Sequence, residues 1–186
     1  MRRNVERRAA LVDAAIEVLA REGARGLTFR AVDAEAGVPT GTASNYFANR
    51  DDMFTQAGGR VYEVLRPQDV PLTGPPTRER LKEIMREVVD RVSTYRSGYL
   101  ALLELRLEAT RRPELRAVLT RTIRADVDAN VRGHRESGLP GDDAAVLLLY
   151  LALNWLVVER LTLPGLFGEE ELNALVDLAV ERAVPA

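Results

Sequence analysis

Apolar positions recur along the chain with helical spacing, and no stretch shows a convincing β-hairpin pattern. At the start, Val5, Ala9, Val12, Ile16 and Leu19 follow one another at intervals of four and three residues, which predicts one buried face of an amphipathic helix. Similar spacing continues along the rest of the chain and indicates about nine helices. The pattern therefore predicts an all-α protein.

A proline-rich stretch, residues 67–76, divides this helical pattern. It holds four prolines and one glycine, a composition that excludes a helix. We therefore expect a smaller unit of four helices over residues 1–66 and a larger unit of five helices over residues 77–186. Expected helix ends are Gly23 and Ser97-Gly98, and expected N-caps are Thr28, Asn49 and Thr77. After the helix at 77–97, the larger unit is expected to have helices near residues 99–111, 114–137, 142–163 and 169–183.

Composition removes several kinds of chemistry. The 186 residues include no cysteine and one histidine, His134, so thiolate sites, disulfides and most histidine metal clusters are excluded. No nucleophile elbow, phosphate-binding loop or zinc-protease motif is present, and we expect neither a cofactor nor a metal. Glu104 and Glu108 lie one helical turn apart, but no Glu-x-x-His motif accompanies them. An enzyme is therefore disfavoured.

Two apolar stretches superficially suggest targeting or membrane segments. In the first, near the start of the chain, Asp13 and Glu17 interrupt the apolar run. The second, Ala144–Val158, has Asn154 as its one polar residue, yet it is shorter than the roughly 20 residues of a membrane span and is closely bracketed by charged residues. We expect a helix that is buried on nearly all sides, in a cytoplasmic protein that does not bind membranes.

The segment Thr28–Phe47 carries the most informative pattern. Two short predicted helices are joined by a turn at Gly37-Val38-Pro39, which is the layout of a helix-turn-helix, whose second helix enters the DNA major groove. The second helix, from Pro39 to about Phe47, is rich in poor helix formers. A face selected for contact with another molecule explains this composition, although a surface helical hairpin without a ligand has the same layout.

Several residues around this segment form a specific set. They are Ala14-Ala15, Gly23, Thr28, Arg30, Ala36-Gly37-Val38, Gly41, Tyr46-Phe47 and Arg50-Asp51-Asp52-Met53. As a set, over roughly residues 9–58, they resemble the N-terminal domain of the tetracycline-repressor (TetR) family of bacterial transcriptional regulators. The resemblance implies a three-helix DNA-binding domain with its connecting helix, followed by a helical domain for effector binding and dimerisation.

The resemblance also implies which residues contact DNA. These are Thr28, Arg30, Thr40, Gly41, Thr42, Ser44, Asn45, Tyr46 and Arg50. At the start of the recognition helix, Gly41 and its neighbours would present main-chain N–H groups as well as side chains. Asn45 can form two hydrogen bonds to adenine, and the Thr42 methyl group can pack on a thymine methyl group. Tyr46 and Arg50 are better suited to positioning the helix on the DNA backbone.

Some positions depart from the family pattern. Many members have serine at Pro39, a basic residue at Thr40 and tyrosine at Ser44. Electrostatic attraction to DNA is therefore expected from Arg2, Arg3, Arg7, Arg8, Arg30 and Arg50. Asp33 stands where a small residue is common, and we do not expect it to contact DNA. The net charge of −2 does not oppose DNA binding, because residues 1–66 hold 10 basic and 9 acidic residues and the acidity lies mainly beyond them.

A homodimer is implied by the family resemblance, through the helices near 142–163 and 169–183. Such a dimer would read a pseudo-palindromic operator. The apolar run Ala144–Val158 independently favours a covering subunit, with a buried central helix of a single subunit as the alternative.

A small apolar or amphipathic effector that releases the operator is also implied, so the chain is predicted to be a ligand-responsive repressor. Candidate effector-binding residues are Tyr95, Tyr99, Leu103, Leu107, Val127, Asn154 and Trp155. Ordinary core packing is the alternative for each of them, and His134 is expected at the surface or at an interface. A DNA-binding regulator without an effector is the rival function.

Overall fold

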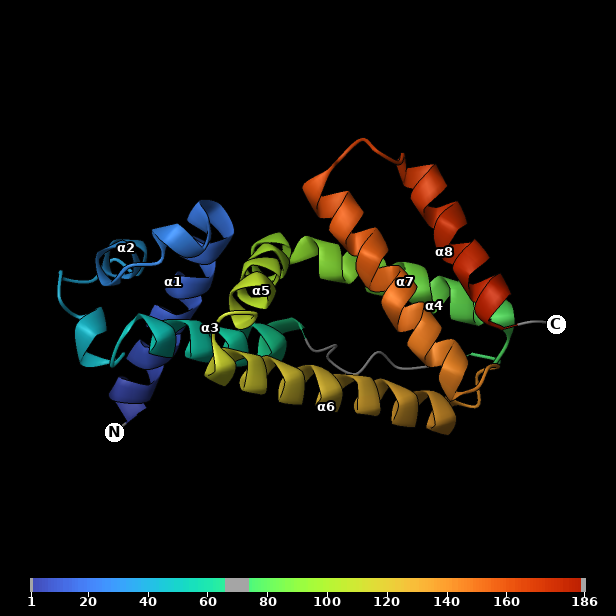
Figure 1. Cartoon of the computed structure of the whole chain (residues 1–186). Helices are drawn as coiled ribbons and strands as arrows, with labels where there is room; N and C mark the ends of the chain where they lie inside the picture. Colours follow the sequence, from blue (N-terminus) through green and yellow to red (C-terminus); the bar gives the residue numbers. More distant parts are fainter. Residues whose placement is uncertain (1, 66–73, 185–186) are drawn as a thin grey trace. The chain divides into compact units, whose positions relative to one another are not determined.

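The computed structural model describes the backbone of residues 2–65 and 74–184, and the side chains of residues 5–63 and 74–184 (Figure 1). Within these ranges the chain forms eight α-helices, one short 3₁₀ helix and no strand. The all-α fold class is therefore confirmed, and the number of helices is close to the predicted nine.

The chain folds into two compact units. The N-terminal unit comprises Met1–Arg66 and Tyr95–Ile123, and the C-terminal unit comprises Pro67–Thr94 and Arg124–Ala186. The N-terminal unit contains α1 (Arg2–Gly26), α2 (Phe29–Glu35), η1 (Ala43–Asn45), α3 (Arg50–Leu65), α5 (Arg96–Ala109) and the start of α6 (Pro113–Ser137). The C-terminal unit contains α4 (Arg78–Thr94), the rest of α6, α7 (Asp143–Thr162) and α8 (Glu169–Ala183).

This division differs from the predicted ranges 1–66 and 77–186, because α5 packs with the N-terminal helices. Leu102 and Leu105 of α5 join Ile16 and Leu19 of α1 in one buried apolar cluster. Apolar side chains from both sides of the proline-rich stretch therefore share a core. Residues 66–73 of that stretch lie outside the described residues.

Local signals placed most helix ends correctly. Gly23 has a φ of 67° and interrupts the regular helix of α1, as expected of a left-handed C-terminal residue, although helical turns continue to Gly26. Thr28 caps α2, since its Oγ1 accepts a hydrogen bond from the Ala31 N–H at 3.1 Å. Each of these contacts spans only a few residues, which is why the sequence predicts them.

The caps predicted at Asn49 and Thr77 are also confirmed. Asn49 Oδ1 accepts from the Asp52 N–H at 2.9 Å, while Asp52 Oδ2 accepts from the Ala48 N–H at 2.9 Å. This reciprocal pair satisfies donors at the start of α3. Thr77 Oγ1 accepts from the Arg80 N–H at 3.2 Å.

The helix end predicted at Ser97-Gly98 is wrong. The break falls at Tyr95, between α4 and α5, and Gly98 is buried inside α5. A Cβ atom on Gly98 would lie 1.9 Å from Cε1 of Tyr95, so glycine is needed there to admit the tyrosine ring. The glycine therefore marks a close packing contact and not a helix end.

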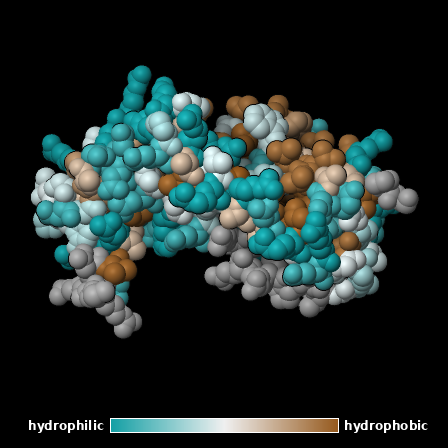
Figure 2. All heavy atoms as spheres, turned by 60° about the horizontal axis from the view of Figure 1, so that its bottom comes forward, coloured by the Kyte–Doolittle hydropathy of each residue, from teal (hydrophilic) through white to brown (hydrophobic). Residues whose placement is uncertain are grey.

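Helix α7 buries one face and exposes the opposite one, so the prediction that it is buried on nearly all sides is wrong within the chain. Ala145 and Leu149 belong to a buried cluster with Leu81 of α4 and Val180 of α8. The exposed apolar stripe of α7 consists of Leu147, Leu148, Leu151 and Trp155, which are 42%, 58%, 66% and 64% exposed. Figure 2 shows hydrophobic side chains gathered on the surface of the C-terminal unit. Exposed apolar stripes of this kind often occur where a protein contacts another molecule.

By length and composition alone, α7 could cross a membrane, and it is the one helix among the described residues that meets this criterion. Core helices of soluble proteins meet the same criterion. Within the C-terminal unit α7 packs against α4 and α8, and 28% of its apolar window is buried.

An ion pair between α4 and α8 predicts a specific pH dependence of stability. Lys82 Nζ lies 2.8 Å from Glu181 Oε1 and 3.0 Å from Glu79 Oε1. The hydrogen bond from Lys82 lowers the pKa of Glu181 below its usual 4.5, and the hydrogen bonds to Glu181 and Glu79 raise the pKa of Lys82 above its usual 10.5. The pair therefore stabilises the fold fully between the usual pKa of a glutamate, 4.5, and the usual pKa of a lysine, 10.5. This stabilisation is lost as the pH falls through the lowered pKa of Glu181 or rises through the raised pKa of Lys82.

We expect Lys82→Met to flatten the fall in unfolding free energy that the wild type shows below pH 4.5. Chemical unfolding at several pH values measures this effect, and Glu181→Gln is the matched variant. The double variant should lose no more than Lys82→Met alone, because Lys82→Met already removes the pair with Glu181. Equal acid slopes in the wild type and Lys82→Met would contradict this prediction.

Candidate nucleic-acid interface

The helix-turn-helix is anchored to the N-terminal unit by apolar side chains. Val32 of α2, Ala43 of η1 and Phe47 are all buried in the same core cluster as α1. Helix α2 packs on α1 and contacts η1. This anchoring leaves the outer side of residues Thr40–Tyr46, hereafter the recognition segment, available to a partner.

The recognition segment is more irregular than predicted. A helix was expected from Pro39 to about Phe47, but the structure has a turn followed by the single 3₁₀ turn Ala43–Asn45. Gly41 has a φ of 93°, a left-handed conformation that glycine adopts without strain and that no α-helix contains. The absence of an α-helix here agrees with the low helix propensity of this sequence.

Side chains of the recognition segment form hydrogen bonds to its own backbone. Thr42 Oγ1 donates to Pro39 O at 2.6 Å, Ser44 Oγ donates to Gly41 O at 2.8 Å, and Asn45 Nδ2 donates to the same oxygen at 3.1 Å. Ser44 and Asn45 are exposed, and Thr42 is half-buried. The bonds orient these side chains while their oxygens keep acceptor capacity toward DNA.

Asp33 is the residue of this motif that sequence reasoning missed. Its side chain is 2% exposed, and its carboxylate accepts from the Gly41 N–H and the Ala43 N–H, each at 2.7 Å. The Gly41 N–H, predicted to be presented to DNA, therefore donates to Asp33 within the chain. A charged residue four positions after the apolar Phe29, on the same side of a short helix, was the available sequence signal.

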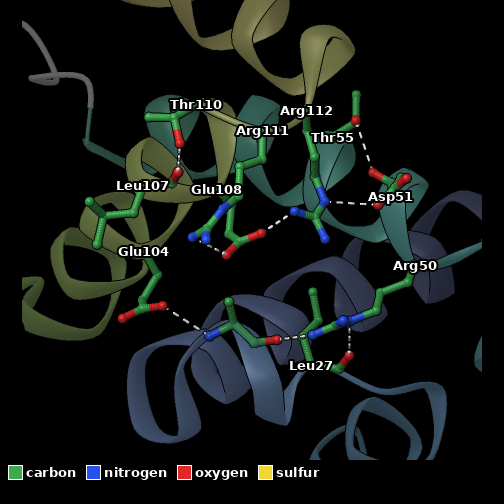
Figure 3. A network of polar contacts seen from close by, with 11 residues as sticks. Leu27, Arg50, Asp51, Thr55, Glu104, Leu107, Glu108, Thr110, Arg111 and Arg112 are labelled. Carbon is green, nitrogen blue, oxygen red and sulfur yellow. Dashed lines mark hydrogen bonds and ion pairs between the residues drawn. The ribbon is translucent and has the colours of Figure 1, made fainter.

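Arg50, predicted to reach a phosphate, donates hydrogen bonds to the connection between α1 and α2. Figure 3 shows its guanidinium directed at the backbone there: Nε donates to Leu27 O at 2.9 Å, and Nη2 donates to Ala24 O. From α5, Glu104 Oε2 accepts from the Ala24 N–H at 2.9 Å. The backbone of Ala24, a few residues before the Thr28 cap, is thus hydrogen-bonded to Arg50 of α3 and to Glu104 of α5.

Arg112 ties the start of α6 to α3. Its Nε donates to Asp51 Oδ1 at 2.8 Å, and its Nη1 donates to Glu108 (Figure 3). The guanidinium carbon lies 4.5 Å from the centroid of the buried Phe54 ring, and that of Arg50 lies 5.4 Å from it. Glu104 and Glu108, which lie one helical turn apart, therefore bind different partners.

The arginines proposed to attract DNA occupy several positions. Arg7, Arg8 and Arg30 are exposed, and Arg8 Nη1 donates to Gln56 Oε1 at 3.0 Å. The side chains of Arg2 and Arg3 lie outside the described residues. Thr28 and Thr40 are exposed, and Tyr46 is half-buried against the core. The predicted DNA-contacting residues thus lie at the N-cap and first turn of α2, in the recognition segment and at the start of α3, whereas Arg7 and Arg8 lie on α1.

The predicted effector-binding residues are divided between the two units. Tyr95, Tyr99, Leu103 and Leu107 lie at or along α5 in the N-terminal unit, and their exposure ranges from 5% for Tyr99 to 60% for Leu107. Burial raises the pKa of Tyr95, and the charges of Asp13 and Glu17 act in the same direction.

The other three, Val127, Asn154 and Trp155, lie on α6 and α7 in the C-terminal unit. Asn154 Nδ2 donates to Tyr150 O at 2.7 Å. Trp155 belongs to the exposed apolar stripe of α7 and is 64% exposed.

One surface hollow of about 510 Å³ occurs in the C-terminal unit, at the connection from α6 to α7. Its lining consists of His134, Arg135, Leu139, Gly141, Asp142, Asp143 and Ala144. His134 Nε2 lies 3.2 Å from Gly141 O, and Arg135 pairs with Asp143. None of the predicted effector-binding residues lines this hollow. No cluster of three His, Asp or Glu side chains suited to a metal ion occurs among the described residues.

Two protein families match the sequence. The family described as "Bacterial regulatory proteins, tetR family" matches residues 11–57, and the one described as "Tetracyclin repressor-like, C-terminal domain" matches residues 76–186. None of the curated proteins matches the chain.

Solved structures share the fold over nearly the whole chain. A transcriptional regulator from Rhodococcus sp. Rha1 is 21% identical, with a TM-score of 0.76 over 95% of each chain. The multidrug binding protein EbrR complexed with ethidium is 25% identical, with a TM-score of 0.71 over 97% of this chain and 99% of its own. EbrR complexed with proflavin is 27% identical, with a TM-score of 0.62 over 93% of this chain and 99% of its own.

Proposed function

Because the chain belongs to the TetR family of bacterial transcriptional regulators, we propose that it is a ligand-responsive repressor that binds a pseudo-palindromic operator as a homodimer. The observation that carries this proposal is the helix-turn-helix itself. Its apolar residues are buried, and its outer face is small, polar and held in one orientation by hydrogen bonds. Such a face fits the major groove.

The recognition segment supplies the proposed contacts to bases. Asn45 and Thr42 are the residues best suited to reading adenine and thymine. Thr28, Arg30, Thr40, Ser44 and Tyr46 complete the proposed contact set, chiefly toward the sugar-phosphate backbone. For Gly41 and Arg50, the contacts within the chain support a positioning role.

Dimerisation is proposed through the outer surfaces of α7 and α8. The exposed apolar stripe of α7 and Leu178 of α8, which is 44% exposed, provide apolar surface on both helices. A two-fold axis would bring the same surface of two subunits together. The two recognition segments would then face successive major grooves.

An effector response is supported by the packing of α5. This helix carries four of the candidate effector-binding residues, and Glu104 on it holds Ala24 just before α2. A ligand that binds preferentially to a state with α5 displaced would favour a changed position of α2 and lower operator affinity. The ligand-bound structures of EbrR support a planar aromatic cation as a first effector to test.

The proposal also covers the cellular location of the protein and an alternative function. Family membership favours a cytoplasmic regulator, and the similar proteins are regulators and not enzymes. The rival function, a DNA-binding regulator without an effector, shares every feature of the DNA interface and differs in ligand response alone.

In vitro selection of bound DNA tests the DNA-binding function. We expect enrichment of a sequence with two inverted half-sites separated by about one helical turn. Enrichment of no sequence above the starting pool would refute the proposal.

Thermal unfolding of the protein with ethidium or proflavin tests the effector class. It is measured without DNA, because such planar cations also bind DNA. A rise in the melting temperature supports this class, and no rise with either cation refutes it.

A further inference from the structure

Asp33 connects α2 to the recognition segment through a buried carboxylate. We infer that Asp33 is a positioning residue that sets the sequence selectivity of DNA binding without touching DNA. This inference rests on the proposed function, namely that the recognition segment contacts bases. At 2% exposure the Asp33 side chain is shielded from a partner, so any effect on selectivity passes through the residues it holds.

The 3₁₀ turn needs the hydrogen bonds that Asp33 provides. The first N–H groups of a helical turn have no partner within the turn, and the residue at the N-cap position usually supplies one. Thr42 occupies that position but accepts no capping hydrogen bond, and its hydroxyl donates to Pro39 O. Asp33 replaces the missing cap from ten residues away in sequence, with Oδ1 at 2.7 Å from the Ala43 N–H.

The second carboxylate oxygen extends this control to the exposed side chains. Asp33 Oδ2 accepts from the Gly41 N–H at 2.7 Å, and Gly41 O in turn accepts from Ser44 Oγ and Asn45 Nδ2. Gly41, with its φ of 93°, has more conformational freedom than any other residue type would have there. Asp33 therefore restricts a flexible residue whose carbonyl oxygen orients two candidate DNA-reading side chains.

Replacement by asparagine separates this role from the volume of the side chain. The amide of Asp33→Asn can accept one of the two hydrogen bonds, but its NH₂ group cannot accept the other. We expect affinity for the selected operator to fall about 10-fold, the effect of losing a well-formed base contact. Affinity for a random duplex of the same length should change less than about 3-fold, because contacts to phosphates dominate it.

The matched control is Asp52→Asn. Asp52 also accepts a backbone hydrogen bond in the N-terminal unit, from the Ala48 N–H, and its replacement removes the same charge. We expect its ratio of operator affinity to random-duplex affinity to equal that of the wild type. Asp33→Glu, which keeps both acceptor oxygens, should recover part of the lost ratio.

Amide hydrogen exchange on the wild type, read by NMR without DNA, gives a second measurement that needs no variant. The Gly41 and Ala43 amides should exchange slowly, and rapid exchange of both would overturn the inference even if Asp33→Asn failed to fold. An unchanged affinity ratio in folded Asp33→Asn, with a selective wild type, would overturn the inference while leaving the proposed function intact. A wild type that binds every duplex equally would overturn both.

Discussion

The variant Leu151→Glu is expected to be a folded monomer with about 100-fold weaker operator binding than the wild type. Leu151 is 66% exposed at the centre of the apolar stripe of α7, so the substitution leaves the core of the subunit intact. In the proposed dimer the new carboxylate would be buried against apolar side chains without a partner, which strongly opposes association. A monomer engages one half-site and loses the gain that comes from binding two linked half-sites.

Sedimentation equilibrium and operator titrations measure these two effects. Leu107→Glu is the matched control, because Leu107 is similarly exposed, at 60%, but lies on α5 in the N-terminal unit. We expect Leu107→Glu to remain dimeric. Affinity of Leu151→Glu for a single half-site should equal that of the wild type, since the helix-turn-helix is unchanged. A Leu151→Glu variant that is still dimeric would show that the stripe does not form the interface.

The variants Arg50→Lys and Arg50→Ala are expected to weaken operator binding to a similar extent, by about 10-fold. The Arg50 guanidinium bridges the carbonyl oxygens of Leu27 and Ala24 and also lies over Phe54. A lysine ammonium cannot reproduce this planar two-point arrangement, although it preserves the charge. If positioning is the role of Arg50, charge alone does not restore binding.

Salt dependence distinguishes this role from a phosphate contact. The slope of log affinity against log salt concentration falls by about 0.9 for each phosphate contact that is lost. We expect both Arg50 variants to keep the wild-type slope. The control is Arg30, exposed on α2, where alanine should lower the slope and lysine should largely preserve both slope and affinity. If Arg50→Lys binds like the wild type while Arg50→Ala loses slope, Arg50 contacts a phosphate directly.

The candidate site was predictable where its interactions are local. The Thr28 cap depends on Ala31, three residues away, and the Asn49 cap depends on Asp52, also three residues away. Residue type and spacing therefore suffice to predict them. The same reasoning placed the helix-turn-helix correctly, but it expected too regular a recognition helix because the hydrogen bonds from Asp33 come from outside the segment.

Contacts between residues far apart in sequence give some residues roles that the sequence alone does not show. The sequence presents Arg50 as an arginine beside a DNA-binding motif, whereas the fold brings it against carbonyl oxygens 23 and 26 residues away. Gly98 was interpreted as a helix end, yet it makes room for the ring of Tyr95. In both cases the partner decides the role, and residue type alone does not identify the partner.

By itself the sequence determined the all-α class, most helix ends and the place of the helix-turn-helix, because these depend on apolar spacing and on hydrogen bonds that span a few residues. Only the tertiary structure decided that α5 shares a core with the DNA-binding helices and that α7 leaves Leu151 and Trp155 exposed. An apolar helix can bury any of its faces. Which face is covered depends on side chains far away in sequence, such as Leu81 and Val180.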